Sequence, residues 1–538
     1  MAAQSHSECK PPVSQSLYMY KYRIQTQSRG IFVASFARRA HRMALNMGAQ
    51  RLRVLVVDGH MSTSLDVAAF LWRQLNARVE LILFYGPGRG TVQYGALQSY
   101  MQRVGSPLLS DEIRENITSY TSACHFGTNF RPCIQQVEPG RPVPFPRHVV
   151  TEIENSVDVV LCQFPGFQCA LFEQMNVGLV IRFAHRFDHH IDKLPHGRKL
   201  WVNMLQRWNS TNRASFFADN PYDVEYLRYF TGVRATLWPM TGASVEDDAE
   251  MANRPADPQW CFCCWSHFPY AGAQHVLNAI RHAASGGSRK DNSVALIRDV
   301  QTRPNSSRLV DSGNCTAYLM IPYSLHGGSN VEAYSSGYPI LVPSPTLLAR
   351  WQFKHSIIPH RFAGNKGYSM WARDLGTDRT INSPDTNDEN IFAKWLSFVD
   401  IYHWPGVRQY DSVDQIPAIM ANVSHATQRN QHQFMRRVAD HATRCVEEQL
   451  WWQAKNRWPS STVHFERSSN WRNFSDQGHC ASLQGMRYKE ELYEFGASTT
   501  SRSTTSHKRV IADRSRPTYS PGHSRDEKMS HSGWRALG

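Results

Sequence analysis

The residues best suited to chemistry lie in one stretch of the chain, from Tyr318 to Trp351. An apolar run there leads to Ser324, and the segment Gly327-Gly328-Ser329-Asn330 then opens a predicted helix with Glu332 in its first turn. The start of a helix presents free backbone N–H groups and the positive end of the helix dipole, which suit a phosphate. A carboxylate one turn inside can accept hydrogen bonds from sugar hydroxyls. The alternative is an ordinary βαβ unit with a capped helix.

This stretch resembles the donor-binding segment of GT-B glycosyltransferases, in which a glycine-bearing loop precedes a Glu-Ala-x-x-x-Gly-x-Pro unit. Glu332-Ala333, Gly337 and Pro339 match that unit as they stand. Retaining members often carry another Glu eight residues earlier, where this chain has Ser324, so inversion and retention both stay open. The resemblance implies a nucleotide-sugar donor, with the Gly327–Asn330 loop at its phosphates and Glu332 at its hydroxyls, and Ser324 among the other donor contacts.

A histidine follows the first predicted strand, residues 51–57, in the sequence Asp58-Gly59-His60. Some inverting GT-B enzymes place a catalytic His after a Gly in this loop, and that likeness implies catalytic roles for His60 and Asp58. A His with a nearby carboxylate can deprotonate an acceptor hydroxyl, because its pKa lies near neutrality. The alternative is a turn that carries a surface His.

A cluster of histidines, His185 to His190, follows the predicted strand 179–183 and contains three His and one Asp. Its side chains are adjacent rather than four apart, and GT-B transfer usually needs no bound metal, so we expect no metal and no cofactor. His185 and Arg186 are instead candidates for acceptor or phosphate contacts.

Further cations are candidates for the diphosphate of the donor. Arg298 follows a predicted strand, and Arg350 and Lys354 follow the helix-strand unit. Cationic side chains of this kind commonly bind the negatively charged oxygens of a diphosphate. A surface salt bridge is the alternative for each.

The segment Asp219-Asn220-Pro221-Tyr222-Asp223 has the composition of a capped helix start. It also resembles a segment in a group of poorly characterised predicted glycosyltransferases, as does Val399–Pro405 further along. These likenesses say little about the donor or the acceptor.

Strands alternate with helices through both halves of the chain, which predicts an α/β fold of two Rossmann-like, doubly wound domains facing across a cleft. In such domains ligands bind at the carboxyl ends of the strands. A long helix is expected near the end of the second half, at residues 425–458. By analogy with GT-B chains, this helix crosses back onto the first domain. The expected segments are an irregular N-terminal part (1–48), an acceptor domain (49–240), a linker (241–258), a donor domain (259–424), a long crossing helix (425–458) and a mostly disordered tail (459–538).

Composition limits the partners and the compartment. The formal charge of +14 is spread diffusely and the aromatic residues sit mostly in apolar runs rather than beside Lys or Arg, so there is no strong case for nucleic acid. The 11 cysteines are irregularly spaced, and those in apolar strands (Cys162, Cys261, Cys263 and Cys264) are expected to be buried reduced thiols. No 18-residue apolar run occurs and residues 1–30 lack a signal pattern, so we expect a soluble, cytoplasmic chain, or a Golgi or ER lumen protein if an N-terminal anchor is missing.

The sequence also holds Asn-x-Ser/Thr sequons, which hint at a secretory route. They lie at Asn116, Asn209, Asn305, Asn314, Asn422 and Asn473.

These observations favour a glycosyltransferase that moves a sugar from a nucleotide-sugar to a hydroxyl of a glycan, protein or small-molecule acceptor. One alternative is a catalytically inactive relative that binds glycans or nucleotides. Another is a basic protein that binds polyanions or nucleic acid. The sequence does not name the sugar or the acceptor.

Overall fold

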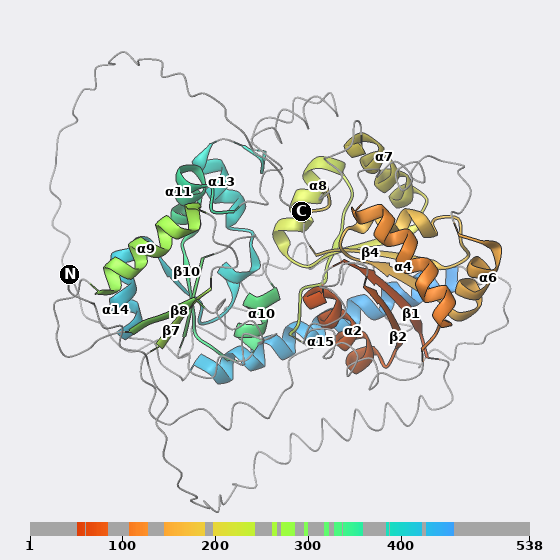
Figure 1. The fold of residues 1–538 in the computed structure, drawn as a ribbon, viewed down its shortest axis with the longest axis horizontal. Coiled ribbons are helices and arrows are strands. Elements are labelled where there is room, and N and C mark those ends of the chain that lie inside the picture. Colours follow the sequence, from red (N-terminus) through yellow and green to blue (C-terminus); the bar gives the residue numbers. More distant parts are fainter. Residues whose placement is uncertain are drawn as a thin grey trace, which may run out of the picture.

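In the computed structural model, the first domain is built on parallel strands that run, among the described residues, in the order β2-β1-β3-β4-β5-β6 (Figure 1). Every neighbouring pair is parallel. The strands are β1 (Arg53–Asp58), β2 (Arg78–Leu83), β3 (Val159–Cys162), β4 (Gly178–Phe183), β5 (Ala214–Ala218) and β6 (Thr236–Leu237). Runs such as Val-Leu-Val-Val in β1 are buried on both faces, which is typical of a parallel sheet covered by helices.

The structure describes fifteen stretches of the chain, and all structural statements concern these residues. They are 51–59, 61–83, 107–126, 145–184, 186–188, 197–242, 261–265, 271–285, 295–299, 317–321, 328–335, 337–358, 383–386, 388–421 and 427–456. The helices of the first domain are α2 (Met61–Leu75), α4 (Asp111–Phe126), α6 (Arg147–Ser156), the 3₁₀ helix η1 (Gly166–Phe172), α7 (Gly197–Ser210) and α8 (Pro221–Thr231).

The second domain repeats the topology of the first, with the described strands in the order β11-β10-β9-β7-β8. Its strands are β7 (Cys261–Trp265), β8 (Ala295–Asp299), β9 (Ala317–Met320), β10 (Ile340–Pro343) and β11 (Arg408–Tyr410), all paired in parallel. Its helices are α9 (Ala271–Ser285), α10 (Gly328–Ser335), α11 (Pro345–His355), α13 (Glu389–Leu396), η6 (Asp400–His403), η7 (Val413–Gln415) and α14 (Ile416–Ala421). The prediction of two doubly wound, Rossmann-like domains is confirmed.

Each sheet has one topological switch point. The chain leaves the first strand toward one side for the second strand and then returns to the other side for the third. The connections that leave β1 and β3 therefore run to opposite sides of the first sheet, and those that leave β7 and β9 run to opposite sides of the second. Ligands of doubly wound folds bind beyond the carboxyl ends of the strands at such points.

The long helix α15 (Thr427–Asn456) contacts both domains and extends from the second domain to the first in Figure 1. Near its start, the Gln431 side chain donates to the carbonyl of Tyr338 in the second domain, at 3.3 Å. Near its end, Gln449 donates to Thr236 at 2.8 Å and Gln453 donates to Ser215 at 3.0 Å, both in the first domain. The helix therefore joins the two domains along its length.

A close approach also joins α10 to the end of the first domain. Gly242 has a φ of +66°, and a Cβ added there would lie 2.1 Å from Oγ of Ser335 in α10. Only glycine combines this backbone conformation with this contact. Helix α10 contacts α2 and α15 as well, so it lies between the two domains (Figure 1).

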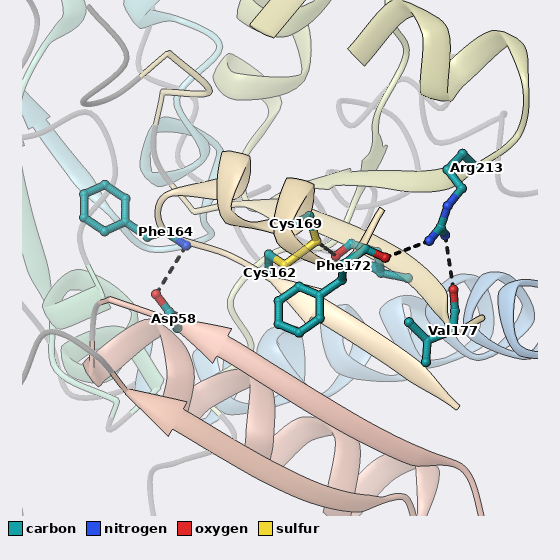
Figure 2. Close-up of a disulfide and its surroundings, with 8 residues drawn as sticks. Asp58, Cys162, Phe164, Cys169, Phe172, Val177 and Arg213 are labelled. Atoms are coloured by element: carbon teal, nitrogen blue, oxygen red, sulfur yellow. Dashed lines mark hydrogen bonds between the residues drawn. A yellow bond between two sulfur atoms is a disulfide. The ribbon is translucent and has the colours of Figure 1, made fainter. Parts of the chain in front are cut away.

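The prediction that Cys162 is a reduced thiol is wrong, although its burial is confirmed. Cys162 forms a disulfide with Cys169 because η1 turns back against β3 and brings the two Cα atoms to 5.7 Å (Figure 2). Arg213 stabilises the following loop by donating to main-chain carbonyls that include those of Phe172 and Val177, at 3.0 and 3.1 Å. Cys445 in α15 is disulfide-bonded too.

Several predictions fall outside the described residues. These are the N-terminal segment 1–48, the tail 459–538 and the linker 241–258 beyond Thr241 and Gly242. The proposed domain boundaries stay predictions. No helix in the described ranges is long and apolar enough to cross a membrane.

Candidate active site

Asp58 ends β1 at the first switch point, where it is fully buried. Its carboxylate accepts hydrogen bonds from Thr63 Oγ1 at 3.0 Å and Ser64 Oγ at 2.7 Å, both in α2. From the end of β3 it accepts the side-chain amide of Gln163 at 2.9 Å and the backbone N–H of Phe164 at 3.3 Å (Figure 2). Asp58 thus ties the start of α2 to the loop after β3, which fixes both sides of the switch point.

His60, the predicted base, lies outside the described residues. Its neighbours on both sides are held: the Gly59 N–H donates to the carbonyl of Phe164 at 2.6 Å, and Thr63 binds Asp58. The roles of His60 and Asp58 in catalysis stay predictions.

Arg182 in β4 extends this network, and the sequence interpretation did not include it. The guanidinium is completely buried, donates to Gln163 at 2.7 Å and to the carbonyl of Trp238 at 3.1 Å, and lies 5.4 Å from the Trp238 ring centroid. Burial lowers the pKa of Arg182, while the charges of Asp219, Asp66 and Asp58 act in the opposite direction. The available signal was a single arginine inside the apolar strand Leu-Val-Ile-Arg-Phe.

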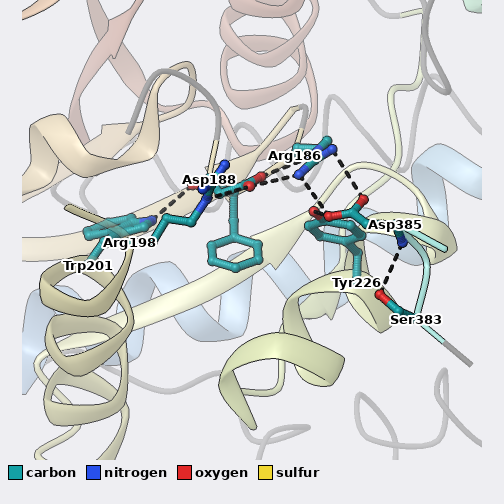
Figure 3. A network of polar contacts seen from close by, with 8 residues as sticks. Arg186, Asp188, Arg198, Trp201, Tyr226, Ser383 and Asp385 are labelled. Atoms are coloured by element: carbon teal, nitrogen blue, oxygen red, sulfur yellow. Dashed lines mark hydrogen bonds and ion pairs between the residues drawn. The ribbon is translucent and has the colours of Figure 1, made fainter. Parts of the chain in front are cut away.

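Arg186 follows β4 and joins the first domain to the second (Figure 3). It donates to both carboxylate oxygens of Asp188, at 2.9 and 2.7 Å, and to Asp385 of the second domain at 3.3 Å. Its guanidinium also lies 4.7 Å from the ring centroid of Tyr226, whose hydroxyl donates to Asp385 at 3.0 Å. One buried carboxylate of the second domain therefore meets two side chains of the first.

Burial opposes the charge of Arg186, but Asp188 and Asp385 outweigh it and raise the pKa of Arg186 well above its ordinary value. Burial likewise opposes the charge of Asp188, yet Arg186 keeps the pKa of that carboxyl below its usual range. The group is therefore ionised throughout the physiological range. Arg186 was predicted to contact an acceptor or a phosphate; in the structure it binds carboxylates, and the predicted contact stays a proposal.

Acidic side chains gather just beyond β5. Asn220 caps α8, since its side chain accepts the backbone N–H of Asp223 at 3.0 Å, and this confirms the helix-cap interpretation. The Asn220 amide also donates to Asp219 at 3.0 Å and to the side chain of Asp223. Burial and the neighbouring Asp219 raise the pKa of Asp223 well above its ordinary value.

Asp400 approaches the same cluster from the second domain, within the segment Val399–Pro405 that the sequence singled out. Burial, followed by the charge of Asp219, raises the pKa of Asp400 to about 8. A ring contact supports the same junction, with Tyr222 and Trp395 centroids 5.9 Å apart. The two segments with the weaker likeness to predicted glycosyltransferases therefore meet in space.

We expect the stability of the fold to fall as pH rises from 6 to 9, because folded Asp400 holds a proton up to about pH 8. An unfolded aspartate loses that proton near pH 4, so the stabilising difference is complete below pH 4 and disappears as pH passes 8. Asp400→Asn carries no such proton and should remove about 3 kcal/mol of the loss between pH 6 and 9, since about two pH units of that range lie below a folded pKa of about 8. The melting temperatures of the wild type and of Asp400→Asn, each at pH 6 and pH 9, measure this difference in stability.

The exposed Asp414 provides the matched control for this measurement. Asp414→Asn should leave the pH dependence of the wild type unchanged. Equal slopes for wild type and Asp400→Asn would contradict the assignment of a neutral Asp400 at pH 7.

The predicted donor residues of the second domain lie at its own switch point. Gly328, Ser329, Asn330 and Glu332 belong to α10, the helix that follows β9. The described part of α10 buries Val331, Ala333, Tyr334 and Ser335, and the Tyr334 hydroxyl donates to the carbonyl of Pro405 at 2.8 Å. Asn330 is half-buried, while the side chains of Ser329 and Glu332, and all of Ser324 and Gly327, lie outside the description.

The remaining predicted cations belong to β8 and α11 of the second domain. Arg298 lies within β8 rather than after it, because that strand runs to Asp299. On α11, Arg350 is exposed with its Nε 3.8 Å from Glu389, and Lys354 is exposed as well. Arg350 and Lys354 therefore lie at the surface, as the alternative of a surface salt bridge expects. His185 lies outside the described residues.

Metal binding finds no support in the described ranges, where no group of three or more His, Cys, Asp or Glu side chains could hold an ion. His185, His189 and His190 are not among those ranges. The expectation that no metal is needed stays a prediction.

Comparison with known proteins gives matches only among solved structures. No protein-family model and no curated protein matches the chain. Similar folds include a glycotransferase of kitacinnamycin, at 12% identity and a TM-score of 0.34 over 74% of this chain and 99% of that one. The glycosyltransferase VinC in complex with DTDP shows 11% identity and a TM-score of 0.35, with 75% and 100% covered.

A third solved structure, the SsfS6 glycosyltransferase of Streptomyces sp. SF2575, shows 10% identity and a TM-score of 0.32, with 74% and 100% covered. Each likeness concerns the fold alone. Because each TM-score lies below 0.5, the assignment of two doubly wound domains rests on the two sheets of this chain.

Proposed function

We propose that the chain is a glycosyltransferase of the GT-B type, with a nucleotide-sugar bound by the second domain and an acceptor hydroxyl by the first. One observation carries the proposal. Helix α10, which begins with Gly-Ser-Asn, follows β9 at the switch point of the second sheet and contacts α2 at the switch point of the first. The sequence likeness to a donor-binding segment falls on this helix.

In this proposal the start of α10 binds the diphosphate and Glu332 accepts hydrogen bonds from the sugar. Free N–H groups at a helix start suit the negative charge that develops as the diphosphate leaves. If the enzyme inverts, His60 takes the proton of the acceptor hydroxyl, whose oxygen bonds to C1 as the C1–O bond to the diphosphate breaks. Asp58 ties the end of β1 to the start of α2 and to the loop after β3 through its four hydrogen bonds to Thr63, Ser64, Gln163 and Phe164.

We expect at least one nucleotide-sugar from a panel to raise the melting temperature of the full chain. Ligand at about 100 times its Kd stabilises a fold by about 2.7 kcal/mol, which is readily measured as a thermal shift. Glu332→Ala should abolish the shift because the donor loses its hydroxyl contacts. The exposed Glu112 of α4 provides the matched control, and Glu112→Ala should keep the full shift.

The outcomes separate the candidate functions. A shift that survives in Glu332→Ala would overturn the donor-site assignment. A donor shift without product formation for any acceptor would favour the catalytically inactive relative. Salt-sensitive binding to a polyanion with no nucleotide response would favour the third alternative, because phosphate contacts release counterions.

The compartment we propose is the lumen of the secretory route rather than the cytoplasm. The Cys162–Cys169 disulfide and the disulfide-bonded Cys445 support this choice. Disulfides form and persist in oxidising compartments and are rare where thiols are kept reduced.

A further inference from the structure

The segment Asn209-Ser210-Thr211 lies at the end of α7 and has the Asn-x-Thr pattern of an N-glycan acceptor. Its three side chains are all exposed. The opposite face of α7 is buried through Trp201, Leu205 and Trp208. Because these residues hold α7 against the domain, Asn209 is left on the outer side of the helix. In Figure 1 this helix lies at the top of the first domain.

The chain turns at Thr211 and Asn212, just after α7 ends at Ser210. The Thr211 N–H donates to the carbonyl of Arg207 at 2.9 Å, and the Thr211 hydroxyl donates to the same carbonyl at 2.8 Å. Asn212 then adopts a positive φ of 52°, which ends the helix. Within the described part of the chain, the Asn209 side-chain amide has no hydrogen-bond partner. Its Nδ2 is therefore open to a transferase at a helix end.

The other described sequon, at Asn116, differs from Asn209 in its exposure and in the hydrogen bonding of its side-chain amide. Asn116 lies inside α4 and is half-buried, and its side-chain amide donates to the carbonyl of Glu112 at 2.9 Å. The next residue, Ile117, is buried in the core. A bulky glycan belongs at a surface position, so the structure favours Asn209 over Asn116.

We propose that Asn209 carries an N-linked glycan, an inference that rests on the luminal compartment proposed above. The donor is a lipid-linked oligosaccharide diphosphate, supplied by the compartment. Asn209 Nδ2 bonds to C1 of the oligosaccharide while the C1–O bond to the diphosphate breaks. The leaving lipid diphosphate takes the electron pair, and a base of the transferase takes the amide proton. The glycan extends into solvent beside α7 and adds a polar covering to that face.

The test uses the full chain purified from the cells that make it. Peptide N-glycosidase in ¹⁸O-water converts a glycosylated Asn to labelled aspartate, which mass spectrometry of the peptide containing residue 209 detects. Alkylation of the denatured chain before reduction reports in the same sample whether Cys162 and Cys169 are bonded. We expect labelled aspartate at position 209 and no alkylation of either cysteine.

Two variants give the matched comparison. Thr211→Ala breaks the sequon and should lose the label, whereas Thr211→Ser keeps the sequon and should retain it. An unlabelled residue 209 with an intact disulfide would overturn the glycan and leave the luminal compartment standing. An unlabelled residue 209 with both cysteines alkylated would overturn both.

Discussion

Replacing Arg182 with methionine should destabilise the protein by about 3–5 kcal/mol, the usual cost of removing one partner from a buried charge network. The variant Arg182→Met leaves the carboxylates of Asp58, Asp66 and Asp219 in the interior without the cation whose charge acts on all three. It also removes the donors that reach Gln163 and the carbonyl of Trp238. The methionine side chain fills a similar volume but replaces neither the positive charge nor the hydrogen-bond donors.

The measurement is the melting temperature of the purified chain, which should fall by on the order of 10 °C for a loss of this size. Arg182→Lys keeps the charge but not the fork of donors, so an intermediate loss is expected. The exposed Arg228, paired with Glu225 on α8, is the matched control, and Arg228→Met should cost under about 1 kcal/mol. If Arg182→Met melted within the range of Arg228→Met, the network would not be what holds the switch point together.

Replacing His60 with alanine should lower kcat by roughly 10²- to 10⁴-fold if the enzyme inverts, which is the usual contribution of general base catalysis. The proposed donor site lies on the other domain, so the thermal shift with nucleotide-sugar should stay at its wild-type value. A loss of turnover with retained donor binding would therefore assign His60 to the acceptor side of the reaction.

Two comparisons sharpen the His60 experiment. The exposed His148 of α6 gives a matched control, and His148→Ala should keep wild-type turnover. The wild-type rate should rise with pH around neutrality as the imidazole loses its proton, a limb that His60→Ala should lack. Wild-type turnover in His60→Ala would remove the histidine from the mechanism and point to a retaining enzyme.

Much of the fold follows from local pattern, because most of the described parallel strands are short apolar runs bounded by turns. The strand Leu179–Phe183 and the helix start at Asn220 are both predictable, since the alternation of strands with helices and the Asx cap depend on neighbouring residues. The doubled topology therefore follows from the amino-acid pattern alone.

The contacts between the domains do not follow in this way. Arg186 meets Asp385, which lies 199 residues further along the chain in a segment without periodicity. Asp219 and Asp400 lie on different domains and come together only when both domains are folded. Residue type predicts which side chains could react, but only the tertiary structure shows which of them interact electrostatically.

The cysteines show the same limit from another side. Apolar surroundings predict the burial of Cys162 correctly, because burial follows from the composition of the strand. The disulfide depends on how η1 folds back after β3, and the spacing of seven residues between Cys162 and Cys169 does not determine that turn.

The most direct test of glycosyl transfer is the release of nucleoside diphosphate from a panel of nucleotide-sugars by the purified full chain. The account predicts release for at least one donor, accelerated by an acceptor, with the same donor giving the thermal shift that Glu332→Ala abolishes. Release at the rate of buffer alone for every donor, with no thermal shift from any of them, would contradict it.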